Sequence, residues 1–220
     1  MDTRRMERLG LDTSVIGMGC WQIGSDWGEV AEEKAMDTLR AAADAGVTFF
    51  DTADVYGDGR SEKLVGKFRK ERGGDIFVAT KMGRRANPHV AAEYNGDNFR
   101  AWNDRSRQNL GMDTLDLVQL HCPPTEVFTT QATYDTLDEM VDEGRFRAYG
   151  VSVERVEEAL AAIERPNVAS VQIILNAFRL KPLEEVLPAA VEAGVGIIAR
   201  VPLASGLLSG RYDKDTEFDP

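Results

Sequence analysis

Short apolar segments alternate with helix-length amphipathic segments along the whole chain, and this alternation is the strongest constraint on the fold. Most of the apolar segments are rich in β-branched residues and lack strict polar alternation, as expected of parallel strands covered on both faces. They lie at 15–18, 47–50, 76–79, 117–120, 149–153, 168–175 and 197–201. Repeated strand–helix units of this kind predict a parallel α/β sheet.

The segments between the predicted strands have the apolar spacing of helices. Residues 30–45 predict the first helix, which Gly46 ends in a left-handed cap. Ser61 is the predicted N-cap of the second helix. Further helices are predicted at 98–110, 134–141, 156–163 and 183–191. No linker composition divides the chain, so we expect a single domain over residues 1–220.

A polar residue closes nearly every predicted strand. From the second strand onward these residues are Asp51, Lys81, His121, Ser152, Asn176 and Arg200, with separations of 30, 40, 31, 24 and 24 residues. Each separation matches one strand–loop–helix unit. A doubly wound sheet would gather its ligand-binding residues at one switch point, whereas polar residues after every strand are typical of a barrel with its active site at the C-terminal face. The pattern therefore favours a barrel.

The net charge and the cysteine count exclude several classes of binding partner. The 220 residues carry a net charge of -11, which argues against sequence-independent binding to nucleic acid or to an anionic membrane. Two cysteines, Cys20 and Cys122, are too few for a disulfide framework and lack the spacing of metal ligands, so we expect no metal site. The N-terminus lacks the apolar stretch of a signal peptide, and a cytoplasmic location is expected.

Five motifs, in order along the chain, resemble those of the aldo-keto reductase family. They are DTADVYGDGRSE from Asp51, ATK ending at Lys81, DLVQLH ending at His121, GVS ending at Ser152 and VPLASGLLSGR from Val201. The resemblance extends over residues 5–212. It implies a TIM-type (β/α)8 barrel that binds NADP(H) across its mouth, with NAD not excluded, and that reduces a small aldehyde or ketone.

The chemistry of carbonyl reduction and the resemblance together point to a tetrad of Asp51, Tyr56, Lys81 and His121. A nicotinamide supplies the hydride, and the developing alkoxide needs a proton from an acid. Tyr56 is the expected acid, and Lys81 is expected to lower its pKa from the ~10 of a free phenol. Asp51 is the expected partner of the Lys81 ammonium, and His121 is expected to hydrogen-bond the carbonyl oxygen.

Each of these four residues, taken alone, is more typical of a structural role. A strand-ending aspartate is commonly a turn cap, and a tyrosine beside glycine commonly packs a loop. A strand-ending lysine is usually solvated, and a buried histidine is usually structural. The order of the four residues along the chain, three of them at strand ends, is what favours catalysis.

The resemblance also assigns a cofactor site. Ser152 and Gln172 are expected to hold the nicotinamide carboxamide, although Gln172 could instead be a core amide paired with backbone. Arg200 stands where some members have a stacking tyrosine, with a rim ion pair as the alternative. The loop at 202–210 is expected to bring backbone N–H groups to the pyrophosphate. The expected cofactor residues are Gly19, Cys20, Trp21, Asp51, Ser152, Gln172, Arg200, Pro202, Leu203, Ser205, Gly206 and Leu207.

The expected substrate residues are Trp21, Trp27, Tyr56 and His121. Family members continue beyond the position of Pro220, through strand eight, the last helices and a segment that grips the adenosine 2′-phosphate. We therefore expect a C-terminally incomplete barrel, or one that a partner completes. Two alternatives to the reductase stay open, a non-catalytic nucleotide-binding regulatory barrel and an inactive fragment. The physiological substrate and the oligomeric state are left open by the sequence.

Overall fold

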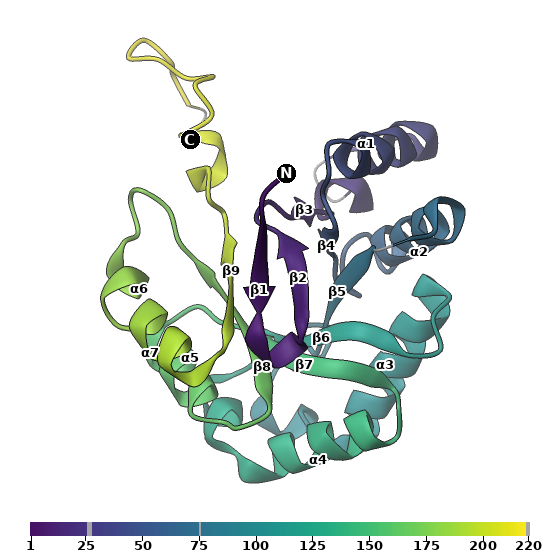
Figure 1. Cartoon of the computed structure of the whole chain (residues 1–220), viewed down its shortest axis with the longest axis vertical. Helices are drawn as coiled ribbons and strands as arrows, with labels where there is room; N and C mark the ends of the chain where they lie inside the picture. Colours follow the sequence, from purple (N-terminus) through teal and green to yellow (C-terminus); the bar gives the residue numbers. More distant parts are fainter. Residues whose placement is uncertain (26–27, 75, 219–220) are drawn as a thin grey trace.

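Residues 1–25, 28–74 and 76–218 are described by the computed structural model of the chain. Within them, a seven-stranded parallel sheet follows the order of the sequence. Its strands are β3 (Met18–Gly19), β4 (Phe49–Asp51), β5 (Phe77–Met82), β6 (Leu115–His121), β7 (Phe146–Ser152), β8 (Val168–Ile174) and β9 (Gly196–Arg200). Figure 1 shows the sheet curving into an open arc with helices on its outer side. Sequential parallel strands, predicted from the sequence, are confirmed.

An antiparallel hairpin of β1 (Thr3–Met6) and β2 (Leu11–Ser14) crosses the open centre of the arc (Figure 1). Met6 packs there in a small core with Phe49, Phe77 and Leu117 on the inner face of the sheet. The strand expected at 15–18 was wrong for residues 15–17, and only Met18 belongs to β3. At the end of the hairpin, Ser14 and Thr48 exchange side-chain to backbone hydrogen bonds of 3.0 Å.

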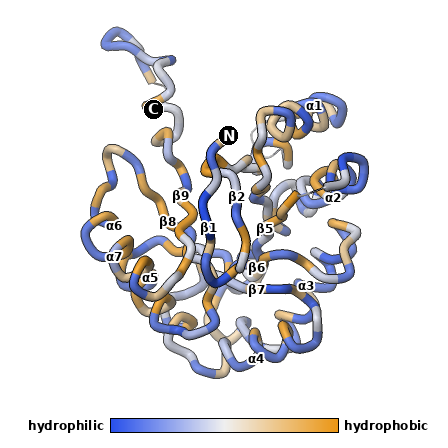
Figure 2. Tube along the Cα trace, in the orientation of Figure 1, coloured by the Kyte–Doolittle hydropathy of each residue, from blue (hydrophilic) through white to orange (hydrophobic). Residues whose placement is uncertain are grey.

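The outer layer consists of helices whose inner sides pack on the sheet. They are α1 (Glu32–Asp44), α2 (Arg60–Arg72), α3 (Gly96–Leu110), α4 (Gln131–Asp142), α5 (Val156–Ile163), α6 (Lys181–Glu184) and α7 (Val186–Ala193). In Figure 2, hydrophobic and hydrophilic colours alternate along α1 and α2, as expected when one side of a helix is buried. Among the described residues, no helix has the length and apolar character that crossing a membrane requires.

Two helix predictions differ from the structure. Gly59, not Ser61, is the N-cap of α2, because the Ser61 hydroxyl lies in the core, where it donates to the Cys20 carbonyl at 2.7 Å. The single helix predicted at 183–191 is two helices, α6 and α7. The ring of Pro188 would clash with the Glu184 carbonyl one turn earlier in a continuous helix, so the chain breaks between them.

Two buried carboxyl groups lie at the start of α2 and in the loop before it. Glu62 is completely buried and accepts hydrogen bonds from Thr80 Oγ1 at 2.6 Å and Asn109 Nδ2 at 2.8 Å. Asp54 follows β4 and is also completely buried, but no side chain among the described residues hydrogen-bonds its carboxylate oxygens. Burial, reinforced by the charge of Glu62, raises the pKa of Asp54 to about 7. Ionisation of Asp54 therefore destabilises the folded protein.

This cost predicts a pH dependence of stability that Asp54→Asn removes. Between the unfolded pKa of ~3.9 and the folded pKa of about 7, only the folded protein keeps the Asp54 proton. The free energy of unfolding therefore falls as the pH rises through this range. As the pH rises from about 4 to about 8, the free energy of unfolding of Asp54→Asn should increase by ~2–4 kcal/mol relative to that of wild type.

Urea denaturation of both proteins across this pH range measures the difference. The matched control is Asp142→Asn, because Asp142 is exposed at the end of α4. If the difference in unfolding free energy between wild type and Asp54→Asn stays constant from about pH 4 to about pH 8, the raised pKa of Asp54 is contradicted.

Candidate active site

The polar strand ends meet at the C-terminal edge of the sheet, as the sequence predicted. Asp51, His121, Ser152 and Arg200 are the last residues of β4, β6, β7 and β9, and Lys81 is the second-last residue of β5. Parallel pairing places His121 opposite Ser152, and Ser152 opposite Gln172. Asn176 lies two residues beyond β8, where its amide donates to the Val201 carbonyl at 3.0 Å.

A buried ion pair lies at the centre of this edge. The Lys81 side chain is 1% exposed, and its Nζ lies 2.5 Å from Asp51 Oδ1. The same ammonium donates to the Thr52 carbonyl at 2.8 Å and to the Tyr56 hydroxyl at 3.3 Å. Burial alone would lower the pKa of Lys81, but the attraction of Asp51 and Tyr56 outweighs it and raises the pKa. Lys81 therefore stays protonated.

Two glutamines hold the other oxygen of Asp51. Gln172 Nε2 donates to Asp51 Oδ2 at 2.9 Å, and Gln119 Nε2 does so at 3.3 Å. The Gln172 side chain is thus paired with side chains rather than with backbone. Gln119 was missed in the sequence, although it lies two residues before His121 on the same strand and so faces the same side.

Three aromatic rings surround the end of the ion pair. The Tyr56 ring stacks on Trp21 with centroids 5.9 Å apart, and it meets the His121 ring edge-on at 5.9 Å. Lys81 Nζ lies 5.0 Å from the Tyr56 ring centroid. The structure therefore brings together three of the four residues expected to bind substrate. The fourth, Trp27, lies outside the described residues.

The ionisation of Tyr56 differs from the expectation. Burial raises the pKa of the phenol above its ordinary value, and the charge of Lys81 offsets only part of this effect. Lys81 lowers the pKa as expected, but the hydroxyl is removed from water, which penalises the phenolate and leaves the net pKa raised. Since the Tyr56 oxygen accepts a hydrogen bond from Lys81, its own proton stays available for a second partner.

His121 is held as a neutral imidazole. Burial, followed by the positive charges of Lys81 and Arg84, holds the pKa of His121 well below its ordinary range. A neutral ring offers one N–H donor and one acceptor. Nδ1 is buried and has no hydrogen-bond partner within the part of the chain that the structure describes. Among these described residues, His121 Nδ1 is therefore a buried polar atom left without a partner at the centre of the site.

The expected carboxamide-binding residues lie directly beside the ion pair. Ser152 Oγ donates to Gln172 Oε1 at 3.4 Å and lies 3.6 Å from Cys122 Sγ. Arg200 Nη2 donates to the Val153 carbonyl at 2.9 Å and pairs with Glu154 at 2.8 Å. Arg200 thus makes the ion pair at the rim, which was the alternative to a role in stacking on the nicotinamide.

The first loop of the site, at residues 19–21, contributes backbone groups and the exposed ring of Trp21. Gly19 and Trp21 are exposed, whereas Cys20 is completely buried. The backbone N–H of Cys20 donates to the Asp51 carbonyl at 2.8 Å. Burial raises the pKa of the Cys20 thiol, so this side chain is an uncharged part of the core.

The last loop has the backbone form expected of an anion-binding segment. Ala204, Ser205 and Gly206 take left-handed conformations, with φ of 49°, 57° and 101°. Pro202, Leu203, Ser205 and Leu207 are exposed around them. Successive N–H groups in such turns can form concavities that bind phosphate oxygens. Here the N–H groups of Ala204, Gly206 and Leu207 donate to the carbonyls of Val201, Leu203 and Ala204, so a phosphate would have to replace these internal acceptors. The Ser152 hydroxyl and the Gln172 amide are groups that can hydrogen-bond a carboxamide, and in this structure they are bonded to each other and, through Gln172 Nε2, to Asp51.

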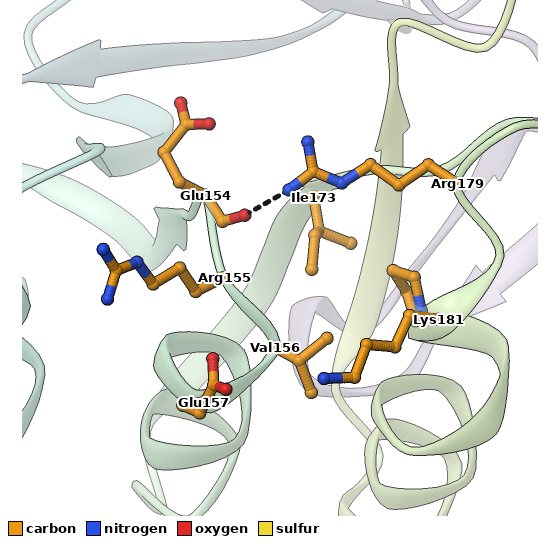
Figure 3. A pocket seen from close by; sticks show the side chains of 8 residues that line it. Glu154, Arg155, Val156, Glu157, Ile173, Arg179 and Lys181 are labelled. Carbon is orange, nitrogen blue, oxygen red and sulfur yellow. Dashed lines mark hydrogen bonds between the residues drawn. The ribbon is translucent and has the colours of Figure 1, made fainter.

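A separate pocket of about 350 Å³ lies between the loop after β7 and the segment after β8 (Figure 3). Its lining includes Val156, Ile173 and Lys181, and Arg179 closes one side by donating to the Glu154 carbonyl at 2.7 Å. None of the four tetrad residues lines it. Among the described residues, no group of three His, Cys, Asp or Glu side chains is placed to hold a metal ion.

Comparison with known proteins agrees with this geometry. A model of the aldo/keto reductase family matches residues 15–220. The chain is 33% identical to the aldo-keto reductase YhdN of Bacillus subtilis, over all of this chain and 67% of YhdN. It is 31% identical to the aldo-keto reductase yakc of Schizosaccharomyces pombe, over 96% of this chain and 64% of yakc.

A solved structure shows the same architecture. The aldo-keto reductase AKR11C1 from Bacillus halodurans superimposes with a TM-score of 0.85 and 31% identity. The match covers 99% of this chain and 72% of that one, so the chain spans about two thirds to three quarters of the length of these three relatives. From its sequence, its parallel half-barrel and the residues at its strand ends, the chain belongs to the aldo/keto reductase family of oxidoreductases.

Proposed function

We propose that this chain catalyses the NADP(H)-dependent reduction of a small aldehyde or ketone to an alcohol, with residues 1–220 acting as one barrel-type domain. The observation that carries the proposal is the continuous contact from Asp51 through the Lys81 ammonium to the Tyr56 hydroxyl, with His121 beside it. Membership of the family supports the reaction class. The name of the yakc relative, which includes NADP(+), supports the cofactor.

A bound nicotinamide supplies the hydride for this reaction. Ser152 and Gln172 would hold its carboxamide, and the loop at 202–207 would hold its pyrophosphate. The neutral His121 ring orients the substrate carbonyl by a hydrogen bond to its oxygen. As the carbonyl carbon gains the hydride, the Tyr56 O–H bond breaks and its proton passes to the carbonyl oxygen.

Lys81 acts on the group that loses the proton. Its ammonium donates to the Tyr56 oxygen, and this bond strengthens as negative charge develops there. Asp51 keeps Lys81 charged in a site where burial would otherwise favour the neutral amine. The phenol is a weak acid in the resting protein, so the positive charge is needed most at the moment of transfer.

Tyr56→Phe tests the proton donor. This change removes only a hydroxyl, so nucleotide affinity should survive while carbonyl turnover falls by the ~10²–10⁴-fold typical of a lost general acid. Nucleotide titration and steady-state kinetics on the same preparations measure the two effects separately. Wild-type turnover in Tyr56→Phe would refute the assignment. A wild-type chain that binds nucleotide without turnover would instead favour the regulatory barrel, and one that does not bind would favour an inactive fragment.

Lys81→Met tests whether the lysine works through the phenol. It removes the charge beside Tyr56 and leaves Asp51 unpaired, so turnover should fall as in Tyr56→Phe. The double variant should be little slower than either single variant, because both changes remove the same step. Circular dichroism controls for folding, since a buried carboxylate loses its partner. Losses that multiply in the double variant would show that Lys81 acts independently of Tyr56.

Gly206→Val tests the pyrophosphate loop. A side chain at this position would block the approach of the backbone to a phosphate, so nucleotide affinity should fall by at least tenfold with the fold retained. Gly144→Val is the matched control, because Gly144 also has a positive φ, 71°, and open space around it, but it follows α4, outside the loop. Equal nucleotide affinities of the two variants, measured by fluorescence titration, would count against the role of Gly206.

A further inference from the structure

The loop that carries Tyr56 has a backbone that other contacts must hold in place. The three residues after Tyr56, namely Gly57, Asp58 and Gly59, all have positive φ, at 57°, 51° and 89°. Non-glycine residues adopt this region at a cost, which aspartate and asparagine bear best. The conformation of Asp58 therefore depends on the contacts that its side chain and backbone make.

Two arginines from separate elements converge on Asp58. Arg85, in the segment after β5, places Nη1 2.5 Å from Asp58 Oδ1. Arg105, on α3, places Nη2 2.8 Å from the same oxygen and 2.8 Å from the Asp58 carbonyl. Both arginines also reach the Asp54 carbonyl, at 3.4 Å. The hydrogen bonds from Arg85 and Arg105 hold the pKa of Asp58 below its ordinary value.

The opposite side of the loop is fixed by close backbone packing. A Cβ on Gly57 would lie 2.0 Å from the Gly24 carbonyl oxygen, so the two backbones are in direct contact. Arg60, at the start of α2, donates to Ser25 Oγ at 2.6 Å on the same side. Charge therefore holds one side of the loop and steric contact holds the other.

We propose that Asp58, Arg85 and Arg105 form a clamp that positions Tyr56 against Lys81, with Asp58 as the positioning residue. This inference rests on the proposed function of Tyr56 as proton donor. The Lys81–Tyr56 hydrogen bond is 3.3 Å long, at the weak end of the usual range, so a small outward movement of the loop breaks it. None of the three clamp residues belongs to the tetrad.

Asp58→Asn is the decisive variant. Asparagine keeps the size of the side chain and tolerates positive φ, so the change removes charge without straining the backbone. Amide hydrogen exchange in residues 52–59 should become about fivefold faster, a modest factor because the Asp58 ion pairs are exposed to solvent. The kcat for carbonyl reduction should fall by a similar factor, while KM and nucleotide affinity stay unchanged.

Glu143→Gln is the matched control. Glu143 is also an exposed carboxylate held by two arginines, Arg100 and Arg145, but it lies at the end of α4. Its substitution should alter neither exchange in residues 52–59 nor kcat. Combining Asp58→Asn with Arg105→Gln should add little to either single variant, because each one opens the same clamp.

The two readouts separate the clamp from the proposed function. Unchanged exchange in Asp58→Asn overturns the clamp. Faster exchange with an unchanged kcat overturns positioning, provided that Tyr56→Phe abolishes turnover. If Tyr56→Phe has wild-type turnover, the proposed proton donor fails, while faster exchange in Asp58→Asn and unaltered exchange in Glu143→Gln still support a clamp on this loop.

Discussion

The buried ammonium of Lys81 is the constraint on which the site depends. An unpaired charge at 1% exposure would cost several kcal/mol, so its three N–H groups need acceptors. These acceptors are Asp51 Oδ1, the Thr52 carbonyl and the Tyr56 hydroxyl, all from β4 and the loop after it. Gln119 and Gln172 then satisfy the second oxygen of Asp51. One charge thus ties together residues from four strands.

Burial and charge act in opposite directions on the groups around this ammonium. For Lys81 the attraction of its partners outweighs burial, so the pKa rises. For Tyr56 burial outweighs the attraction of Lys81, so the phenol keeps its proton in the resting protein. For His121 burial and the neighbouring positive charges act together, so the ring is neutral. The Lys81 cation, the neutral Tyr56 phenol and the neutral His121 imidazole therefore lie together at the C-terminal edge of the sheet.

The parts of the site are held by two different kinds of contact. The strand ends are held by parallel pairing and by the core beneath them, including the β1–β2 hairpin across the inner face. The Tyr56 loop and the loop at 202–207 depend instead on left-handed residues and local contacts. The Asp58 clamp lies on the exposed side of the Tyr56 loop, where salt and substitution weaken ion pairs most readily.

The sequence by itself determined the parallel sheet, its sequential order and the strand-end positions of Asp51, Lys81, His121 and Ser152, because strand and helix periodicity are local properties of the chain. Only the tertiary structure decided the N-terminal hairpin, the break before α7, the buried role of Ser61, and the pairing of Gln119 with Asp51 and of Asp58 with Arg85 and Arg105. These contacts join residues that are far apart in the chain or depend on how deeply a side chain is buried. The net pKa shift of Tyr56 has the same origin, since desolvation is set by everything that surrounds the hydroxyl and not by its neighbours in sequence.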